Sequence, residues 1–291
     1  MTAKLASMTP ATPAPRHVLE ARDVSLAYGK RTVVDQVSLT AEAGALTVVI
    51  GPNGSGKSSL LRALTGEAAH TGEVELNGRS LSGIAPEELA RDRGVLAQHT
   101  ALAFPLTVAE VVRLGIRRNL SLSARQAHAR IAEALEKVDL SGFAPRPYHS
   151  LSGGEQQRVH LARVLCQVWE PVSDHGPRWL FLDEPVSSLD IHHQIMIMDV
   201  AADYARRGGG VVAVLHDLNL TALFADQVLV MKEGQLLARG RPATVLTDAI
   251  VSKAFDHPLR VGAVPRAGMP FILPQTSGDN ATQGAIAAAR G

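Results

Sequence analysis

The chain has 291 residues, of which 46% are hydrophobic, enough to build one large domain or two small ones. Its 29 lysines and arginines nearly balance 28 aspartates and glutamates, which argues against the strongly cationic surface of a nucleic-acid-binding protein. A single cysteine, Cys166, excludes a disulfide framework and fits a reducing compartment. The longest apolar runs are strand-sized, well short of the roughly 20 residues that span a membrane. We therefore expect a soluble intracellular protein, for which any membrane role must come through a partner.

The order of the predicted elements indicates an α/β core. Alternating apolar and polar residues predict antiparallel strands at 18–28, 33–39 and 72–79, the last around an Asn77-Gly78 turn. Continuous apolar runs predict strands buried on both faces at 45–50, 179–182 and 211–215. Further elements are expected as follows: a short strand at 93–98, a helix at 191–207, and a hairpin of 227–231 with 235–238.

A helical block interrupts this core at about residues 99–165. Apolar residues recur at helical spacing from Ala127 to Val138. Helix starts are marked by two capping boxes, Thr107 with Glu110 and Ser123 with Gln126. The sequence therefore predicts an α/β fold with an antiparallel β subdomain and an inserted helical subdomain. We expect residues 17–275 to form this one domain, between a disordered leader (1–16, with Met8 an alternative start) and a disordered tail (276–291).

A glycine-rich loop directly after the strand at 45–50 matches the phosphate-binding pattern G-x-x-x-x-G-K-[ST] and precedes an apolar-periodic helix. Its glycines let backbone N–H groups turn toward a phosphate. Lys57 supplies a charge to the β- and γ-phosphates, and the Ser58 hydroxyl is a ligand for Mg²⁺. The loop consists of Gly51, Pro52, Asn53, Gly54, Ser55, Gly56, Lys57 and Ser58.

Two acids end the strand at 179–182, at the edge where ligands of α/β proteins collect. Asp183 is placed to hold Mg²⁺, and Glu184 is placed to take the proton of an attacking water or to orient it. His216 ends the last buried strand and could sense the γ-phosphate, although a lone histidine is more often a surface or capping residue. Gln98, at another strand end, could reach the metal or the water; spacing does not decide this.

The segment Leu151-Ser152-Gly153-Gly154-Glu155 opens another helix. Ser152 and Glu155 form a third capping box, which explains these two residues but not the glycines, since glycine lowers helix propensity. Gly153 and Gly154 make sense if a phosphate approaches the exposed N–H groups at the helix end. The segment thus indicates a second nucleotide contact, made within the chain or across a dimer.

Together these motifs resemble those of ATP-binding cassette (ABC) ATPases, over residues 18–254. The resemblance implies that residues 51–58 form the Walker A loop, followed by Ser59, and that Asp183 and Glu184 form Walker B with its catalytic glutamate. It assigns Gln98 to the Q-loop, with a role at the Mg²⁺ ion, and His216 to the switch histidine. Three further parts are implied: Tyr28 as the aromatic that stacks on adenine, 151–155 as the signature, and Ser187–Asp190 as the D-loop. Val186 departs from the threonine common in the family.

The resemblance also implies partners. With one Walker A loop and one signature, a complete site requires a homodimer that holds two ATP molecules with Mg²⁺, each contacted across the dimer by the signature and Asp190. Two separate permease subunits and, indirectly, a periplasmic substrate-binding protein are implied, with the chain at the cytoplasmic face of the inner membrane. Residues 104–115, 188–194 and 216–219 resemble those of the importers of iron chelates, haem and cobalamin. The polar loop 169–178, together with Ser187-Ser188 and residues 257–272, resembles the haemin-import group. Siderophore or cobalamin import is the close alternative, and a soluble ABC ATPase or a non-hydrolysing regulator is more remote.

Overall fold

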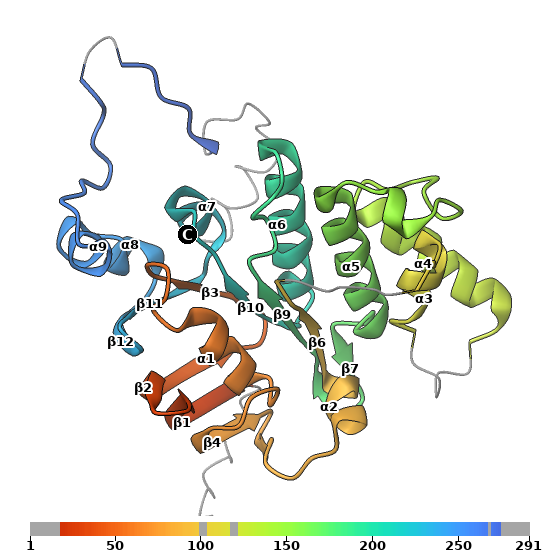
Figure 1. The fold of residues 1–291 in the computed structure, drawn as a ribbon, viewed down its shortest axis with the longest axis horizontal. Helices are drawn as coiled ribbons and strands as arrows, with labels where there is room; N and C mark the ends of the chain where they lie inside the picture. The colour runs from red at the N-terminus through yellow and green to blue at the C-terminus, as the bar shows by residue number, and fades with distance from the viewer. Residues whose placement is uncertain (1–17, 99–103, 117–121, 267–268, 275–291) are drawn as a thin grey trace, which may run out of the picture.

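The structure, a computed structural model, describes residues 18–98, 104–116, 122–266 and 269–274. A six-stranded sheet lies at the centre of the fold, in the order β12-β11-β3-β10-β9-β6 (Figure 1). All neighbouring pairs are parallel except β11 with β12. Its strands are β3 (Leu46–Ile50), β6 (Arg93–Leu96), β9 (Trp179–Asp183), β10 (Gly210–Val214), β11 (Gln227–Lys232) and β12 (Gln235–Gly240). Every residue of β3, β9 and β10 is buried, which confirms the interpretation of their continuous apolar runs.

An antiparallel sheet packs beside the central one, in the order β2-β1-β4-β5. Its strands are β1 (Val18–Tyr28), β2 (Arg31–Glu42), β4 (Thr71–Leu76) and β5 (Arg79–Ser80). The turn between β4 and β5 places both Asn77 and Gly78 at positive φ, as the Asn-Gly pair predicts. Helix α1 (Lys57–Leu64) lies between the two sheets (Figure 1), so the residues after the phosphate-binding loop are covered on both sides.

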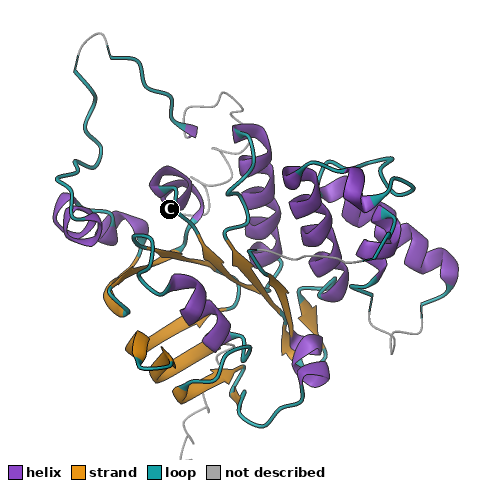
Figure 2. Ribbon diagram, viewed as in Figure 1, coloured by secondary structure: helices purple, strands orange, loops and turns teal. Residues whose placement is uncertain are grey.

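The central sheet separates two hydrophobic cores. Along β3 the side chains alternate, so that Val48 and Ile50 belong to one core and Val49 belongs to the other. The core on the side of Val49 contains α1 and the antiparallel sheet. The opposite core contains the long helices α5 (Gly153–Gln167) and α6 (Ile191–Arg206), which lie side by side in Figure 2.

The helical subdomain is formed by α3 (Val108–Arg113), α4 (Ala124–Lys137) and α5. Both predicted capping boxes at the start of α3 and α4 are present, with side-chain and backbone hydrogen bonds in each direction. The remaining helices are α2 (Pro86–Asp92), α7 (Leu218–Phe224), α8 (Pro242–Val245) and α9 (Asp248–Phe255). The expected leader and tail, and residues 99–103 and 117–121 of the predicted block, lie outside the described residues.

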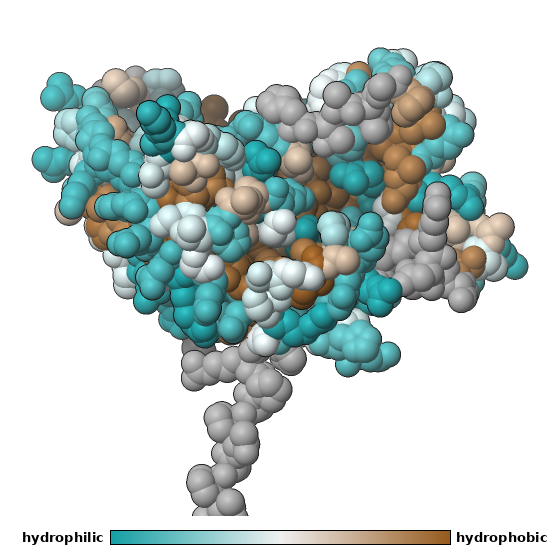
Figure 3. All heavy atoms as spheres, turned by 60° about the horizontal axis from the view of Figure 1, so that its bottom comes forward, coloured by the Kyte–Doolittle hydropathy of each residue, from teal (hydrophilic) through white to brown (hydrophobic). Residues whose placement is uncertain are grey.

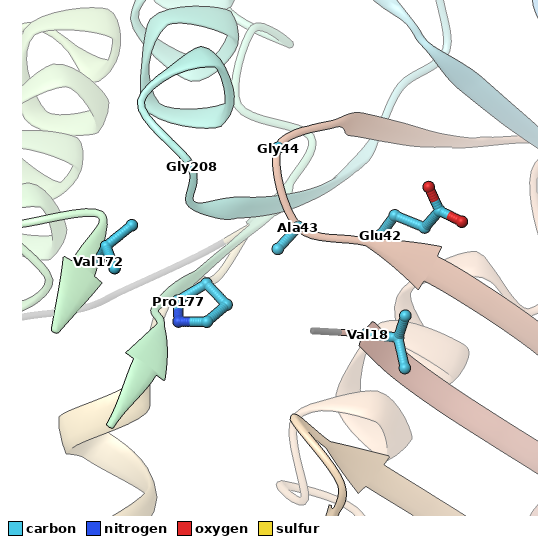
Figure 4. A pocket seen from close by; sticks show the side chains of 7 residues that line it. All are labelled: Val18, Glu42, Ala43, Gly44, Val172, Pro177 and Gly208. Carbon is cyan, nitrogen blue, oxygen red and sulfur yellow. The ribbon is translucent and has the colours of Figure 1, made fainter. Parts of the chain in front are cut away.

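The polar segment expected as a loop at 169–178 contains a small antiparallel hairpin of β7 (Val172–Ser173) and β8 (Gly176–Pro177). This hairpin borders a cleft of about 510 Å³, shown in Figure 4, where Glu42 is the charged group among the lining residues. The face shown in Figure 3 is mixed, with small hydrophobic patches among hydrophilic residues. Within the described ranges no helix has the length and apolar character needed to cross a membrane.

Candidate functional site

The phosphate-binding loop turns sharply between β3 and α1. Gly56 has a φ of 97°, and a Cβ atom built there would lie 2.3 Å from the Val33 carbonyl oxygen. Glycine is therefore required at this position both for its backbone conformation and for the close approach of β2. The sequence pattern and the tertiary contact thus agree on this residue.

Two polar side chains of the loop fit a phosphate ligand. The Lys57 side chain is buried, and its ammonium donates to the carbonyl oxygens of Gly51 (2.9 Å) and Pro52 (3.0 Å). Burial lowers the pKa of Lys57, while Glu184 and Asp183 oppose this shift. Ser55 Oγ is buried and has no hydrogen-bond partner among the described residues. A desolvated cation and an unsatisfied hydroxyl in one glycine-rich turn form a suitable cradle for an anionic phosphate.

A hydroxyl and a carboxylate meet where α1 starts and β9 ends. Ser58 Oγ donates to Asp183 Oδ1 at 2.9 Å, so two oxygens from distant segments of the chain lie together. Burial raises the pKa of the Asp183 carboxyl, and the hydrogen bond from Ser58 opposes the shift. Oxygen ligands of this kind are those that Mg²⁺ prefers. The donor set therefore fits the predicted metal site.

The Glu184 carboxylate is held between two side chains. Gln98 Nε2 donates to Glu184 Oε2 at 2.6 Å, and His216 Nε2 pairs with Glu184 Oε1. The Glu184 side chain is 13% exposed, and its backbone has a left-handed φ of 50°. Glutamate pays a steric cost in this conformation, and such strain is concentrated at functional sites. The structure thus brings together three residues that the sequence placed at three separate strand ends.

Tyr28 lies at the end of β1 and is half exposed. Its hydroxyl accepts a hydrogen bond from Arg62 on α1 at 3.2 Å. This contact ties the aromatic ring to the helix that follows the phosphate-binding loop. The position is compatible with an exposed stacking surface beside that loop; its contact with adenine stays a prediction.

The signature segment caps α5. Ser152 Oγ accepts from the Glu155 backbone N–H, and the Glu155 carboxylate accepts from the Ser152 backbone N–H at 2.7 Å. The hydrogen bonds that the Ser152 backbone N–H and hydroxyl donate to this carboxylate hold the pKa of Glu155 below its usual value. A Cβ at Gly153 would meet nothing within 4 Å, whereas one at Gly154 would lie 2.9 Å from Leu189 Cδ2. Gly153 therefore leaves the helix end open, and Gly154 has a packing reason that the sequence did not reveal.

The structure adds a contact of Gln157, a residue of the signature helix to which the sequence assigned no role. It lies one turn into α5, and its Nε2 donates to the backbone carbonyl of Glu184 at 2.9 Å. The signature helix and the acidic end of β9 are therefore in direct contact within one chain. No sequence spacing connects these two residues, so the contact comes from the packing of α5 against the loop after β9.

A second polar cluster lies where α6 starts. Asp190 caps α6 and also accepts from His193, whose other ring nitrogen lies 3.3 Å from Asp139 at the end of α4. Ligand atoms of Asp139, His192 and His193 lie within 4.8 Å of one another. Arg158 already pairs with Asp139 at 3.6 Å, and a helix N-terminus disfavours a cation. The cluster is best explained as a contact between the helical subdomain and the core.

Comparison with known proteins agrees with this geometry. Residues 34–187 match the family described as ABC transporter. The chain is 56% identical over 261 residues to the hemin import ATP-binding protein HmuV of Mesorhizobium japonicum, covering 89% of this chain and 99% of that protein. It is 52% identical over 262 residues to the HmuV protein of Rhizobium meliloti, with the same coverage.

Solved structures are similar in fold. One is the dimeric structure of a post-hydrolysis state of the ATP-binding cassette MJ0796 bound to ADP and Pi, with a TM-score of 0.68 and 26% identity over 77% of this chain and 98% of that chain. Another is the dimeric structure of MJ0796, a bacterial ABC transporter cassette, with a TM-score of 0.68 and 28% identity at the same coverage. The phosphate-binding loop, the clamped glutamate and these similarities lead to one assignment: the chain belongs to the ABC transporter family, as an ATP-binding subunit.

Proposed function

We propose that this chain binds and hydrolyses ATP to drive a bacterial haem importer. The observation that carries the proposal is the Glu184 carboxylate, held by Gln98 and His216 next to the Ser58–Asp183 pair. The choice of haem rests on the relatives that are named hemin import ATP-binding proteins and share about half of their residues with this chain over nearly their whole length.

The residues divide the chemistry of hydrolysis between them. Lys57 and the backbone of the glycine-rich loop bind the β- and γ-phosphates, and Tyr28 supports the adenine. Ser58, Asp183 and Gln98 would hold Mg²⁺, which would supply positive charge against the phosphates. Glu184 takes a proton from the attacking water. His216 pairs with this carboxylate and fixes its direction, and we expect His216 to contact the γ-phosphate.

A homodimer completes the site. The described chain has its Walker A helix, α1, and its signature helix, α5, in the cores on opposite faces of the central sheet. We infer that Ser152, Gly153, Gly154, Glu155 and Asp190 contact the ATP held by a second copy, in a closed two-fold arrangement. The similarity to dimeric cassette structures supports this arrangement. ATP binding closes the dimer, and loss of the γ-phosphate releases it.

The import role requires membrane partners. We propose that two permease subunits bind the helical subdomain at the cytoplasmic face of the inner membrane, and that a periplasmic binding protein delivers the cargo to them. Phe104 and Leu114, both more than half exposed, lie in this subdomain and offer apolar contacts.

The test is the ATPase activity of the chain in complex with the permease that co-purifies with it. Haem-loaded binding protein should raise turnover, and Glu184→Gln should lower hydrolysis to a small residual rate while leaving an ATP-bound dimer on size-exclusion chromatography. Glu170→Gln, at an exposed glutamate beside Arg207, is the matched control and should behave as wild type. Normal hydrolysis by Glu184→Gln would refute the mechanism. Stimulation by a siderophore or cobalamin instead of haem would refute the cargo.

A further inference from the structure

One face of the signature helix carries both of its contacts to the loop after β9. Gly154 and Gln157 are three residues apart and therefore lie on the same side of α5. A Cβ at Gly154 would lie 3.3 Å from the Ser188 carbonyl oxygen and 2.9 Å from Leu189 Cδ2. Gln157 Nε2 donates to the Glu184 carbonyl at 2.9 Å. The loop from Glu184 to Leu189 thus rests on the signature helix at both of its ends.

The backbone of Glu184 is fixed by several hydrogen bonds. Its N–H donates to the Val214 carbonyl on β10 at 3.2 Å, and its carbonyl accepts from Ser187 N–H at 3.3 Å as well as from Gln157. A left-handed φ at a residue other than glycine persists where the surroundings hold it. Of the two hydrogen bonds to this carbonyl, the one from the Gln157 side chain is shorter, and its donor lies outside the loop. It therefore helps to hold Glu184 in the conformation that directs its carboxylate toward Gln98 and His216.

We propose that Gln157 is a positioning residue for ATP hydrolysis, which makes the orientation of Glu184 depend on the place of the signature helix. The proposal rests on the proposed function, because it takes Glu184 as the base and the start of α5 as the contact to the partner's ATP. When the ATP of the second copy binds the start of α5, it fixes the position of this helix. Gln157 lies one helical turn further along, so its hydrogen bond then fixes the backbone of Glu184. Each ATP site then acts on the catalytic glutamate of the subunit whose signature it contacts.

The experiment compares two glutamines of one helix in the full chain. Gln157→Met keeps the length of the side chain and removes the N–H donor. Gln167→Met does the same at the other end of α5, where Gln167 Nε2 donates to the carbonyls of Ala90 and Arg93. Both variants lose hydrogen bonds to backbone carbonyls, so both should lower the melting temperature. We expect Gln157→Met to lower kcat at least about ten-fold with KM for ATP changed less than about two-fold, and Gln167→Met to leave kcat unchanged.

A double variant separates positioning from a general loss of structure. Glu184→Gln removes the base, so adding Gln157→Met to it should lower the residual rate no further. A lower residual rate in the double variant than in Glu184→Gln alone would overturn the proposal. So would a kcat of Gln157→Met that equals that of wild type or of Gln167→Met. Glu184→Gln measured alone keeps the two ideas apart. If it is inactive while Gln157→Met is fully active, the positioning role fails and the proposed function stands; if it is active, the proposed function fails.

Discussion

Replacing Gly56 by alanine should destabilise the chain far more than the same change at Gly54. Both glycines lie in the phosphate-binding loop with left-handed backbone, at φ of 97° and 78°, so each alanine costs about 1–2 kcal/mol in backbone strain. At Gly54 the new Cβ meets nothing within 4 Å. At Gly56 it lies 2.3 Å from the Val33 carbonyl oxygen and 3.4 Å from Met231 Cε. Relieving this overlap requires β2 or the loop to move, which adds about 1–3 kcal/mol.

The measurement is urea unfolding of both variants without nucleotide, followed by tryptophan fluorescence. We expect a loss of about 1–2 kcal/mol for Gly54→Ala and about 2–5 kcal/mol for Gly56→Ala. In thermal unfolding each kcal/mol corresponds to a shift of about 2–4 °C for a domain of this size. Nucleotide affinity should fall more in Gly56→Ala, because the whole loop is displaced. Equal destabilisation of the two variants would refute the steric argument.

Three further experiments test separate features of the fold. Glu155 has a lowered pKa because it accepts hydrogen bonds from Ser152. Its contribution to the free energy of unfolding is therefore fully present above the ordinary carboxyl pKa of about 4.3, and it is lost as the pH falls through the lower pKa of the folded state. Glu155→Gln should therefore destabilise the chain at pH 7 in urea unfolding and match wild type near pH 3; a difference that stays constant would contradict this. Burial raises the pKa of Cys166 to about 12, so its thiol should not react with Ellman's reagent at pH 8 until the protein is unfolded. Fast reaction of the native protein would show that α5 is not packed as described. Asn77 accepts from Trp179 Nε1 and donates to the Pro177 carbonyl, so Asn77→Ala should cost about 1–3 kcal/mol by leaving a buried indole N–H without a partner. Asn77→Gly also removes the amide, but glycine adopts the positive φ without strain, so this variant should lose a similar free energy of unfolding. If Asn77→Gly were as stable as wild type, the loss in Asn77→Ala would come from backbone strain and not from the hydrogen bonds.

Much of the fold could be predicted because the pattern of each segment is local. Continuous apolar runs occur where a strand is buried on both faces, and this holds for β3, β9 and β10. Capping boxes consist of residues three positions apart, so both helix starts, at Thr107 and Ser123, could be identified before any packing was known. The hairpin of β7 and β8 was missed because strands of two residues in a polar segment carry no periodic signal.

Some residues of the candidate site could be predicted from local motifs, and others depend on contacts between distant segments. Lys57, Ser58, Asp183 and Glu184 could be assigned because each occupies a fixed place in a motif of strand and loop, and the reaction requires a phosphate cradle and acids at a strand end. Gln98 and His216 could not be assigned by spacing, since 86 and 32 residues separate them from Glu184. The parallel order of β6, β9 and β10 brings their ends to one edge of the sheet and makes both contacts possible. Gln157 and the packing of Gly154 depend on how α5 lies against the loop after β9, and a contact between distant segments leaves no trace in the local pattern of either one.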